Sequence, residues 1–249
     1  MSLLDLLLGS GTKQREALDL SWLGVDMHSH LIPGIDDGSQ SMDESITMIG
    51  RLVKLGIKKI ITTPHIMTEF YKNSPGTILT GLDDLRAALK AYDVDVEIEA
   101  AAEYYLDEIF MQKVEAGEKL LTMGGQYVLV ETGFMSKPQM LLESFFALEL
   151  QGYTPIFAHP ERYLYLHNDE KLLKSLMDRG ILFQANLLSY TGYYGKAVKK
   201  FAERLVDAKQ VMLLGTDAHN IKYLDALEDL TMHKYYHKLR ALPLLNSSL

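Results

Sequence analysis

The chain has 249 residues and no cysteine, and 33 acidic against 25 basic residues give it a net charge of −8. The absence of cysteine excludes disulfides, thiolate metal sites and mechanisms with a Cys nucleophile. The acidic balance argues against sequence-independent nucleic-acid binding, which needs many Lys and Arg contacts to phosphates. A chain of this length suits either one α/β barrel or two small domains.

The first apolar stretch of the chain covers residues 3–8 and is interrupted by Asp5. It is much shorter than the roughly 20 residues that span a bilayer, and no positively charged region precedes it. We expect it to form a short amphipathic helix that packs on the body or on another subunit, which leaves room for a homo-oligomer. Since no other run approaches a membrane-spanning length, we expect a cytoplasmic protein that does not cross a membrane.

Seven short apolar segments rich in β-branched residues recur along the chain, and each is followed by a stretch with helical spacing. The predicted strands cover residues 25–28, 59–63, 94–100, 127–131, 155–158, 181–185 and 211–215. The predicted helices cover residues 43–55, 82–91, 107–115, 139–150, 170–179, 196–208 and 223–239. Alternation of strands with helices predicts parallel β-α-β units, and strands as apolar as these are typical of a sheet covered on both faces.

Seven β-α units either close into a barrel or remain an open sheet. An open sheet normally places its site at one crevice, whereas ligand-type residues here follow six different strands. We therefore predict an α/β fold in the form of a closed or distorted barrel. No Pro/Gly/Ser-rich linker divides the chain. Residues 71–81, which include Asn-Ser-Pro-Gly-Thr, are predicted to form a mobile loop beside the site.

The strongest local motif is Asp-Met-His-Ser-His, which places His28 and His30 at the end of the first predicted strand. Alternate residues of a strand point the same way, so the two imidazoles can face one point. A lone histidine is more often a hydrogen-bonded core residue. A pair at a strand end favours a metal site.

Further ligand-type residues stand at the ends of the later strands. They are His65, Glu103, Glu131, His159, Asp217 and His219, while Asp36 and Asp37 lie in a turn-like Pro-Gly-Ile-Asp-Asp-Gly segment. Charged residues that cap apolar strands are costly to bury unless they are paired or bound to metal, and barrels carry their active sites at these strand ends. So many ligands exceed the needs of one ion, and we expect two or three.

A donor set of imidazoles and carboxylates without thiolates fits Mn, Fe or Zn. The remaining histidines, His167, His233 and His237, fall in loop or helix contexts, and we interpret them as surface residues.

With these motifs in hand, the chain resembles the polymerase-and-histidinol-phosphatase (PHP) superfamily and is most similar to its bacterial capsule-biosynthesis protein-tyrosine phosphatases. The resemblance rests on the ordered blocks at residues 26–38, 63–65, 159–163 (His-Pro-Glu-Arg-Tyr) and 217–220 (Asp-Ala-His-Asn), together with Glu103 and Glu131. It implies a distorted TIM-like barrel of seven β-α units. It also implies that residues 1–21 form an N-terminal extension, here expected to be helical, and that residues 22–249 form the phosphatase domain.

The resemblance further implies a trinuclear site, with Mn²⁺ favoured. One ion would take His28, His30, Glu103 and Asp217; a second would share Glu103 and add Glu131 and His159; the third would use Asp37, His65 and His219. The resemblance places Arg162 beside the metals, where a guanidinium can bind phosphate oxygens; a surface ion pair with Glu161 is the alternative. Arg162, Asp217 and His159 are the expected catalytic residues. Lys222 is the candidate for a second phosphate-binding group, because an expected arginine is missing after Asn220.

The expected reaction is hydrolysis of a phosphomonoester by a metal-bound hydroxide. The resemblance implies that the substrate is a phosphotyrosine protein, namely the Tyr-rich tail of a polysaccharide-assembly tyrosine kinase. Three alternatives remain open at this stage: a small-molecule phosphatase such as a histidinol-phosphate phosphatase, an amidohydrolase-like enzyme, and a non-catalytic metal-stabilised binding domain.

Overall fold

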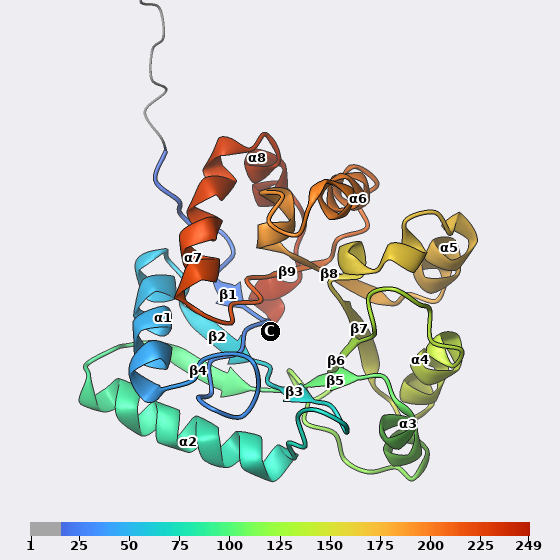
Figure 1. Ribbon diagram of the computed structural model, residues 1–249, viewed down its shortest axis with the longest axis horizontal. Coiled ribbons are helices and arrows are strands. Elements are labelled where there is room, and N and C mark those ends of the chain that lie inside the picture. The colour runs from blue at the N-terminus through green and yellow to red at the C-terminus, as the bar shows by residue number, and fades with distance from the viewer. Residues whose placement is uncertain (1–15) are drawn as a thin grey trace, which may run out of the picture.

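The computed structural model describes residues 16–249. Parallel strands occupy the interior and helices surround them (Figure 1). The predicted helix at residues 3–8 lies outside the described residues. Among residues 16–249, no helix combines the length and the apolar character that a membrane crossing requires.

The strands form two parallel sheets, ordered β1-β2-β4 and β3-β5-β6-β7-β8-β9. Two strands are each followed by a further short strand beyond the predicted segment: β3 follows β2 after a break of two residues, and β5 follows β4 in the same way. The strands are β1 (Val25–Asp26), β2 (Lys59–Thr62), β3 (His65–Ile66), β4 (Glu97–Ala100), β5 (Glu103–Tyr105), β6 (Tyr127–Glu131), β7 (Thr154–Ala158), β8 (Leu182–Asn186) and β9 (Leu213–Gly215). The predicted parallel α/β fold is confirmed.

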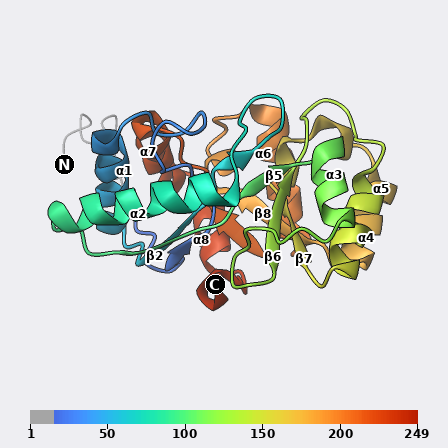
Figure 2. The same ribbon diagram turned by 90° about the horizontal axis from the view of Figure 1, so that it is seen from below.

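Helices α1 to α6 connect strands, α7 and α8 follow the last strand, and the helices lie around the strands, as Figures 1 and 2 show. They are α1 (Met42–Lys54), α2 (Pro75–Ala91), α3 (Glu108–Glu115), α4 (Leu141–Leu150), α5 (Glu170–Asp178), α6 (Lys196–Asp207), α7 (Ile221–Leu227) and α8 (Tyr235–Arg240). Short 3₁₀ turns cover Pro160–Arg162, Leu164–Leu166, Leu187–Tyr190, Glu228–Met232 and Asn246–Ser248.

Two predicted segments differ from the structure. Residues 71–81 are not a loop, because α2 begins at Pro75; Ser74 caps it in a capping box with Thr77, and proline fits the first turn of a helix. Asn73 anchors the preceding residues through hydrogen bonds to two backbone carbonyls. The single helix predicted at residues 223–239 is also wrong, since a 3₁₀ turn separates α7 from α8.

The first and last strands meet at the edges of the two sheets. Ser29 and Ala218 form a single parallel bridge, and the Asp217 N–H donates to the His28 carbonyl at 2.8 Å. The Thr216 backbone and hydroxyl both donate to the buried Asp26 carboxylate. Among the described residues these contacts, rather than a regular ladder, join the edges, which makes the ring of strands a distorted one.

The segment after α8 fastens the same junction at the other end of the strands, where Figure 2 shows the C-terminus. The Asn246 side chain is buried; it donates to the carbonyls of Val25 and Leu214 and accepts from the Leu214 N–H. One amide therefore satisfies three backbone groups that no ladder reaches.

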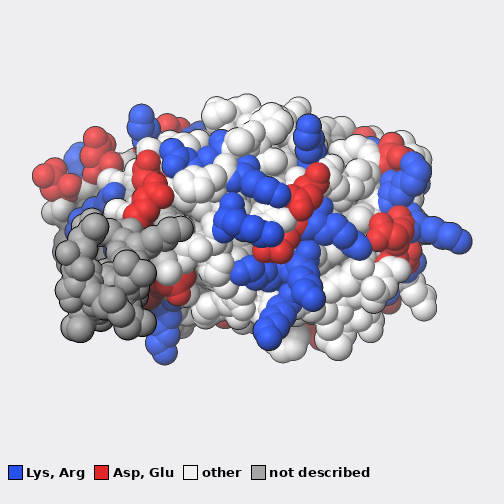
Figure 3. All heavy atoms as spheres, turned by 90° about the horizontal axis from the view of Figure 1, so that it is seen from above, with Lys and Arg blue, Asp and Glu red and all other residues white. Residues whose placement is uncertain are grey.

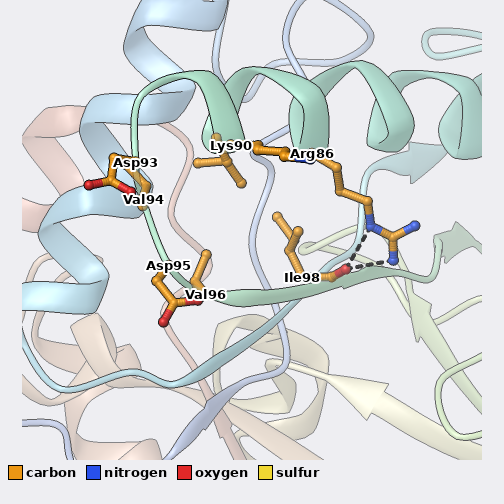
Figure 4. A pocket seen from close by; sticks show the side chains of 8 residues that line it. Arg86, Lys90, Asp93, Val94, Asp95, Val96 and Ile98 are labelled. Atoms are coloured by element: carbon orange, nitrogen blue, oxygen red, sulfur yellow. Dashed lines mark hydrogen bonds between the residues drawn. The ribbon is translucent and has the colours of Figure 1, made fainter.

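Arg86 fixes the long helix α2 to the strand beside it. Its guanidinium donates from Nε and Nη2 to the Ile98 carbonyl at 3.1 and 2.7 Å (Figure 4). The surrounding surface hollow of about 420 Å³ lies between α2 and β4, on Asp93, Asp95 and Lys90, and contains no histidine. This hollow is thus distinct from the strand-end cluster.

The surface charge is unevenly distributed. Figure 3 shows Lys and Arg side chains gathered on the face formed by α6 and α8. The net charge of −8 therefore arises elsewhere, and acidic groups concentrate at the strand ends described below.

We expect Asn246→Ala to lower the free energy of unfolding by roughly 3 kcal/mol, because it leaves buried backbone groups without partners. Urea unfolding followed by circular dichroism measures this as a lower midpoint at unchanged slope. Ser247→Ala, on the exposed neighbour, is the control and should leave the midpoint unchanged. An Asn246→Ala midpoint equal to that of the wild type would show that the junction does not depend on this amide.

Candidate metal centre

His28 and His30 continue the line of β1 into the interior and lie side by side. Both side chains are fully buried, their ring centroids are 5.5 Å apart, and their Nε2 atoms are 3.4 Å apart. Because alternate residues of an extended segment point the same way, both rings face one point. The structure thus brings together the pair that the sequence motif singled out.

Glu103, the first residue of β5, is the hub of the cluster. Its Oε2 lies 3.1 Å from His28 Nε2, 3.3 Å from His30 Nε2 and 3.3 Å from His65 Nδ1. Its Oε1 lies 3.1 Å from His159 Nε2. A single fully buried carboxylate therefore stands within reach of four imidazoles from three parts of the chain.

Asp217 follows β9, the edge strand of the six-stranded sheet, and faces the same histidine pair. Its Oδ1 lies 3.4 Å from His28 Nε2 and 3.5 Å from His30 Nε2. Its Oδ2 accepts hydrogen bonds from Asn186 Nδ2 at 2.6 Å and from Arg162 Nη1 at 3.1 Å. The two oxygens of this carboxylate thus face different partners.

A third group of ligand-type side chains lies nearer to solvent. Asp37 Oδ1 is 3.3 Å from His65 Nε2 and 3.6 Å from His219 Nε2, and the Asp37 side chain is 51% exposed. Glu131 Oε1 lies 3.0 Å from His65 Nδ1, so His65 joins this outer group to Glu103. The site therefore runs from a buried floor to an open edge.

Polar side chains behind the histidines fix their orientation. The Nδ1 atom of His30 lies 2.8 Å from Asp36 Oδ2, and the Nδ1 atom of His28 lies 2.8 Å from Gln184 Oε1. An acceptor on Nδ1 favours the tautomer that leaves Nε2 free as a ligand. Asp36, considered above as an extra ligand, thus lies behind a histidine.

The charges in the cluster shift one another's protonation. Burial alone would raise the pKa of Glu103, yet His28 and His65 hold it well below its ordinary value. Burial would lower the pKa of His28 and His65, yet neighbouring carboxylates raise both. Asp217 is likewise held well below its ordinary pKa, against the effect of burial, by His28 and His219. The carboxylates therefore stay ionised and attract positive charge.

The backbone is strained at two of these positions. His159 and Asp217 have φ of 31° and 52°, in the left-handed backbone region that residues other than glycine rarely adopt. Such strain persists where the surrounding structure imposes it, and it clusters at functional sites. Here it follows directly after β7 and β9, where it turns each side chain toward the cluster.

Within residues 16–249, Arg162 is the only Lys or Arg that lines the cavity above the cluster. Its guanidinium lies between two aromatic rings, 4.4 Å from the centroid of Phe134 and 4.5 Å from that of Tyr194. Burial would lower its pKa, but Asp217 raises it, so it is permanently charged. The alternative of an ion pair with Glu161 is wrong, because Glu161 is buried and accepts from Asn186 and Ser189.

The cavity has a volume of about 320 Å³, and aromatic and apolar side chains surround its polar floor. The floor consists of the ligand-type residues and Arg162. The walls are Met67, Tyr71, Tyr105, Thr132, Gly133, Phe134 and Tyr223. The hydroxyl of Tyr223 is protonated at neutral pH, because burial and Asp217 raise its pKa to about 12. The shape suits a small anion attached to a flat ring.

The described residues fit divalent metal ions. Three overlapping sets each place one ligand atom per residue within 4.8 Å of the others: His30, Asp37, His65 and His219; His28, His30 and Glu103; His65, Glu103 and Glu131. Among the described residues, His159 Nδ1 makes no hydrogen bond, and His65 Nδ1 makes none of suitable geometry although Glu131 Oε1 lies 3.0 Å away. Imidazoles and carboxylates without thiolates form the donor set of Mn, Fe or Zn sites.

Sequence reasoning missed Gln184 and Asn186, which hold His28 and Asp217 from β8. Their spacing of two within an otherwise apolar strand was the available signal, since both face the same side. Lys222 is exposed on the first turn of α7 and does not line the cavity; its phosphate-binding role stays a prediction. Of the three other histidines, His237 is exposed, whereas His167 and His233 are half-buried.

Gly215 leaves room for His28. A Cβ at this position would lie 2.6 Å from the His28 Cβ, closer than real Cβ contacts occur. We expect Gly215→Ala to push His28 out of place and weaken metal binding at least tenfold, comparable to the loss of an orienting partner. Metal content after dialysis against buffered Mn²⁺ measures the effect.

Gly50→Ala is the matched control, because it adds the same methyl group in helix α1 where nothing lies within 4 Å. It should leave metal content unchanged. Equal metal content in both variants would show that the position of His28 is not critical.

The comparisons with known proteins agree with this geometry. A model of the CpsB/CapC family, described as capsular polysaccharide synthesis, matches residues 24–226. The tyrosine-protein phosphatase YwqE of Bacillus subtilis is 33% identical over 198 residues, which are 80% of this chain and 78% of the relative. The tyrosine-protein phosphatase CpsB of Streptococcus pneumoniae is 27% identical over 220 residues, which are 85% and 90% of the two chains.

A solved structure from a study of these two proteins, described as unique metal-dependent tyrosine phosphatases, superposes on the chain with a TM-score of 0.74. The two share 31% sequence identity, over 89% of this chain and 94% of the other.

Proposed function

The chain belongs to the CpsB/CapC family of capsular polysaccharide synthesis proteins, and on this premise we propose that it is a metal-dependent protein-tyrosine phosphatase. The observation that carries the proposal is the position of Arg162, a lone cation held between two rings above a buried cluster of imidazoles and carboxylates. The negative oxygens of a phosphate are bound by cations. Arg162 is one such cation, and the cluster attracts metal ions that would supply further positive charge.

The grouped ligand atoms support more than one ion, and we propose three ions in the arrangement that the family resemblance implies. His28, His30, Glu103 and Asp217 would hold the first. Glu131 and His159 would complete the second with Glu103, and Asp37, His65 and His219 would hold the third. The short distances from Glu103 to four imidazoles support a bridging role for its carboxylate. Mn²⁺ is the ion we favour.

Bound divalent ions lower the pKa of water from about 15.7 toward about 7 and neutralise charge on phosphoryl oxygens. The chain's own contribution is positioning. Arg162 presents a planar fork of N–H donors, and stacking on Phe134 and Tyr194 aims it across the cavity. Asp217 fixes one edge of that fork from below. Arg162 would thereby bind two oxygens of the phosphoryl group and stabilise the charge that develops there.

The aromatic walls support an aryl phosphate as the substrate. Tyr71 and Tyr223 stack on His65 and His219, with ring centroids 5.4 and 5.2 Å apart, so their faces frame the entrance. A phosphotyrosine ring would pack against such walls in offset or edge-on contact. Tyrosine leaves as a phenolate with a pKa near 10, so it needs little help from a general acid.

The physiological substrate would be a phosphotyrosine protein, and we propose the Tyr-rich tail of a polysaccharide-assembly tyrosine kinase. Both proteins would meet on the cytoplasmic side of the membrane. The exposed rim of the cavity, which includes Phe134 and Asp37, is open enough for a peptide rather than only a small molecule.

Removal of metal should abolish turnover of p-nitrophenyl phosphate, and addition of Mn²⁺ to the chelated protein should restore it. Parallel assays with phosphotyrosyl peptides and histidinol phosphate compare the two substrate classes, and we expect the peptides to give the higher kcat/KM. Absence of turnover by fully metallated protein would rule out a phosphatase. A preference for histidinol phosphate would instead favour the small-molecule alternative.

Arg162→Lys should keep the positive charge beside Asp217 but lose the planar fork and its stacking. We expect near-normal metal content with kcat/KM for phosphotyrosyl peptides reduced about a hundredfold. Arg179→Lys, at an arginine that also lies over a ring, that of Phe146, is the control outside the site. Loss of metal from the Arg162 variant would contradict the separation of phosphate binding from metal binding. His159→Ala, by contrast, should lower both the metal content and kcat/KM for phosphotyrosyl peptides.

A further inference from the structure

A second hollow adjoins the catalytic cavity. It has a volume of about 300 Å³ and lies between the loop after β3 and the start of α3. We call it the flanking groove; its lining residues are Met67, Thr68, Glu69, Phe70, Tyr105, Asp107, Glu108 and Ile109. None of them belongs to the proposed metal centre.

Met67 and Tyr105 line both the flanking groove and the catalytic cavity. The two hollows are therefore separated only by the thickness of these shared side chains. Consecutive residues of an extended peptide advance by about 3.3–3.6 Å. A peptide with its phosphotyrosine in the cavity would thus place a residue beside it in the groove.

Hydrogen bonds hold the two segments that line the flanking groove in place. Asp107 accepts from the Phe110 N–H at 2.8 Å and from the Thr68 N–H at 3.3 Å, which ties the loop to the first turn of α3. The loop closes on itself through the antiparallel bridge between Met67 and Tyr71. Both carboxylate oxygens of Asp107 are used in this way, so it shapes the groove.

The lining combines apolar surface with unneutralised negative charge. Phe70 and Ile109 are 68% and 40% exposed, and Met67 completes the apolar part. Glu69 and Glu108 are exposed carboxylates, and in the described part of the chain no Lys or Arg lines the groove. Such a surface complements a long side chain that has an apolar stem and a cationic end.

We propose that the flanking groove binds a residue next to the phosphotyrosine and selects Lys or Arg there. Its methylene groups would pack on Met67, Phe70 and Ile109, and Glu69 and Glu108 would hold its charge. This inference rests on the proposed function and adds a sequence preference to it. Exposed ion pairs are individually weak, so the preference should be modest and should fall as salt is added.

The test uses the metal-loaded full chain and phosphotyrosyl peptides that differ at a single position, carrying Lys, Ala or Glu at each of the two places on either side of the phosphotyrosine. At low salt we expect one position at which kcat/KM falls about tenfold from Lys to Glu, with Ala between. In the Glu69→Gln/Glu108→Gln double variant the range should shrink to within about twofold.

Glu115→Gln is the control, because it removes the same charge from the other end of α3, outside the groove. It should keep the wild-type preference. Equal turnover of the Lys and Glu peptides by wild type, or an unchanged preference in the double variant, overturns the groove while leaving the phosphatase intact. No turnover of any peptide overturns the proposed function, and the groove with it.

Discussion

The site depends on one buried carboxylate, that of Glu103. A charge without solvent is tolerable only among compensating partners, and four imidazoles supply them within 3.3 Å. The two interruptions of the sheets lie beside it. β2 ends at Thr62 and β4 ends at Ala100, and the strands resume at His65 and Glu103, which are register partners. The register therefore places these two ligand-type residues at the same level.

Much of the site could be predicted from the sequence, because the ends of the strands have a recognisable pattern. An apolar run followed at once by His or Glu, as at Glu131 and His159, indicates a polar side chain held at the edge of a sheet. Pro64 marks the break after β2, because proline has no N–H to donate to a ladder, whereas nothing in Ala101-Ala102 marks the break after β4. Ser-Pro-Gly-Thr was misread as a loop because the same residues serve as a turn and as a helix start.

Asp217 couples two parts of the site that the sequence left separate. One of its oxygens faces the histidine pair, and the other accepts from Arg162 and Asn186. Because these partners use different oxygens, the carboxylate can orient Arg162 while its other oxygen still faces the imidazoles.

The junction of the first and last strands also has a consequence in time. Asp26 and Thr216, which hydrogen-bond across it, are 190 residues apart in sequence. At about 5–20 residues per second, a ribosome needs roughly 10–40 seconds to add that much chain. During this interval β9 has not been synthesised, so the edge of β1 that faces it is unpaired. Exposed strand edges can pair with other chains. A strand of only two residues has few unpaired backbone groups to offer such a partner, so the shortness of β1 disfavours pairing of the nascent protein with other chains.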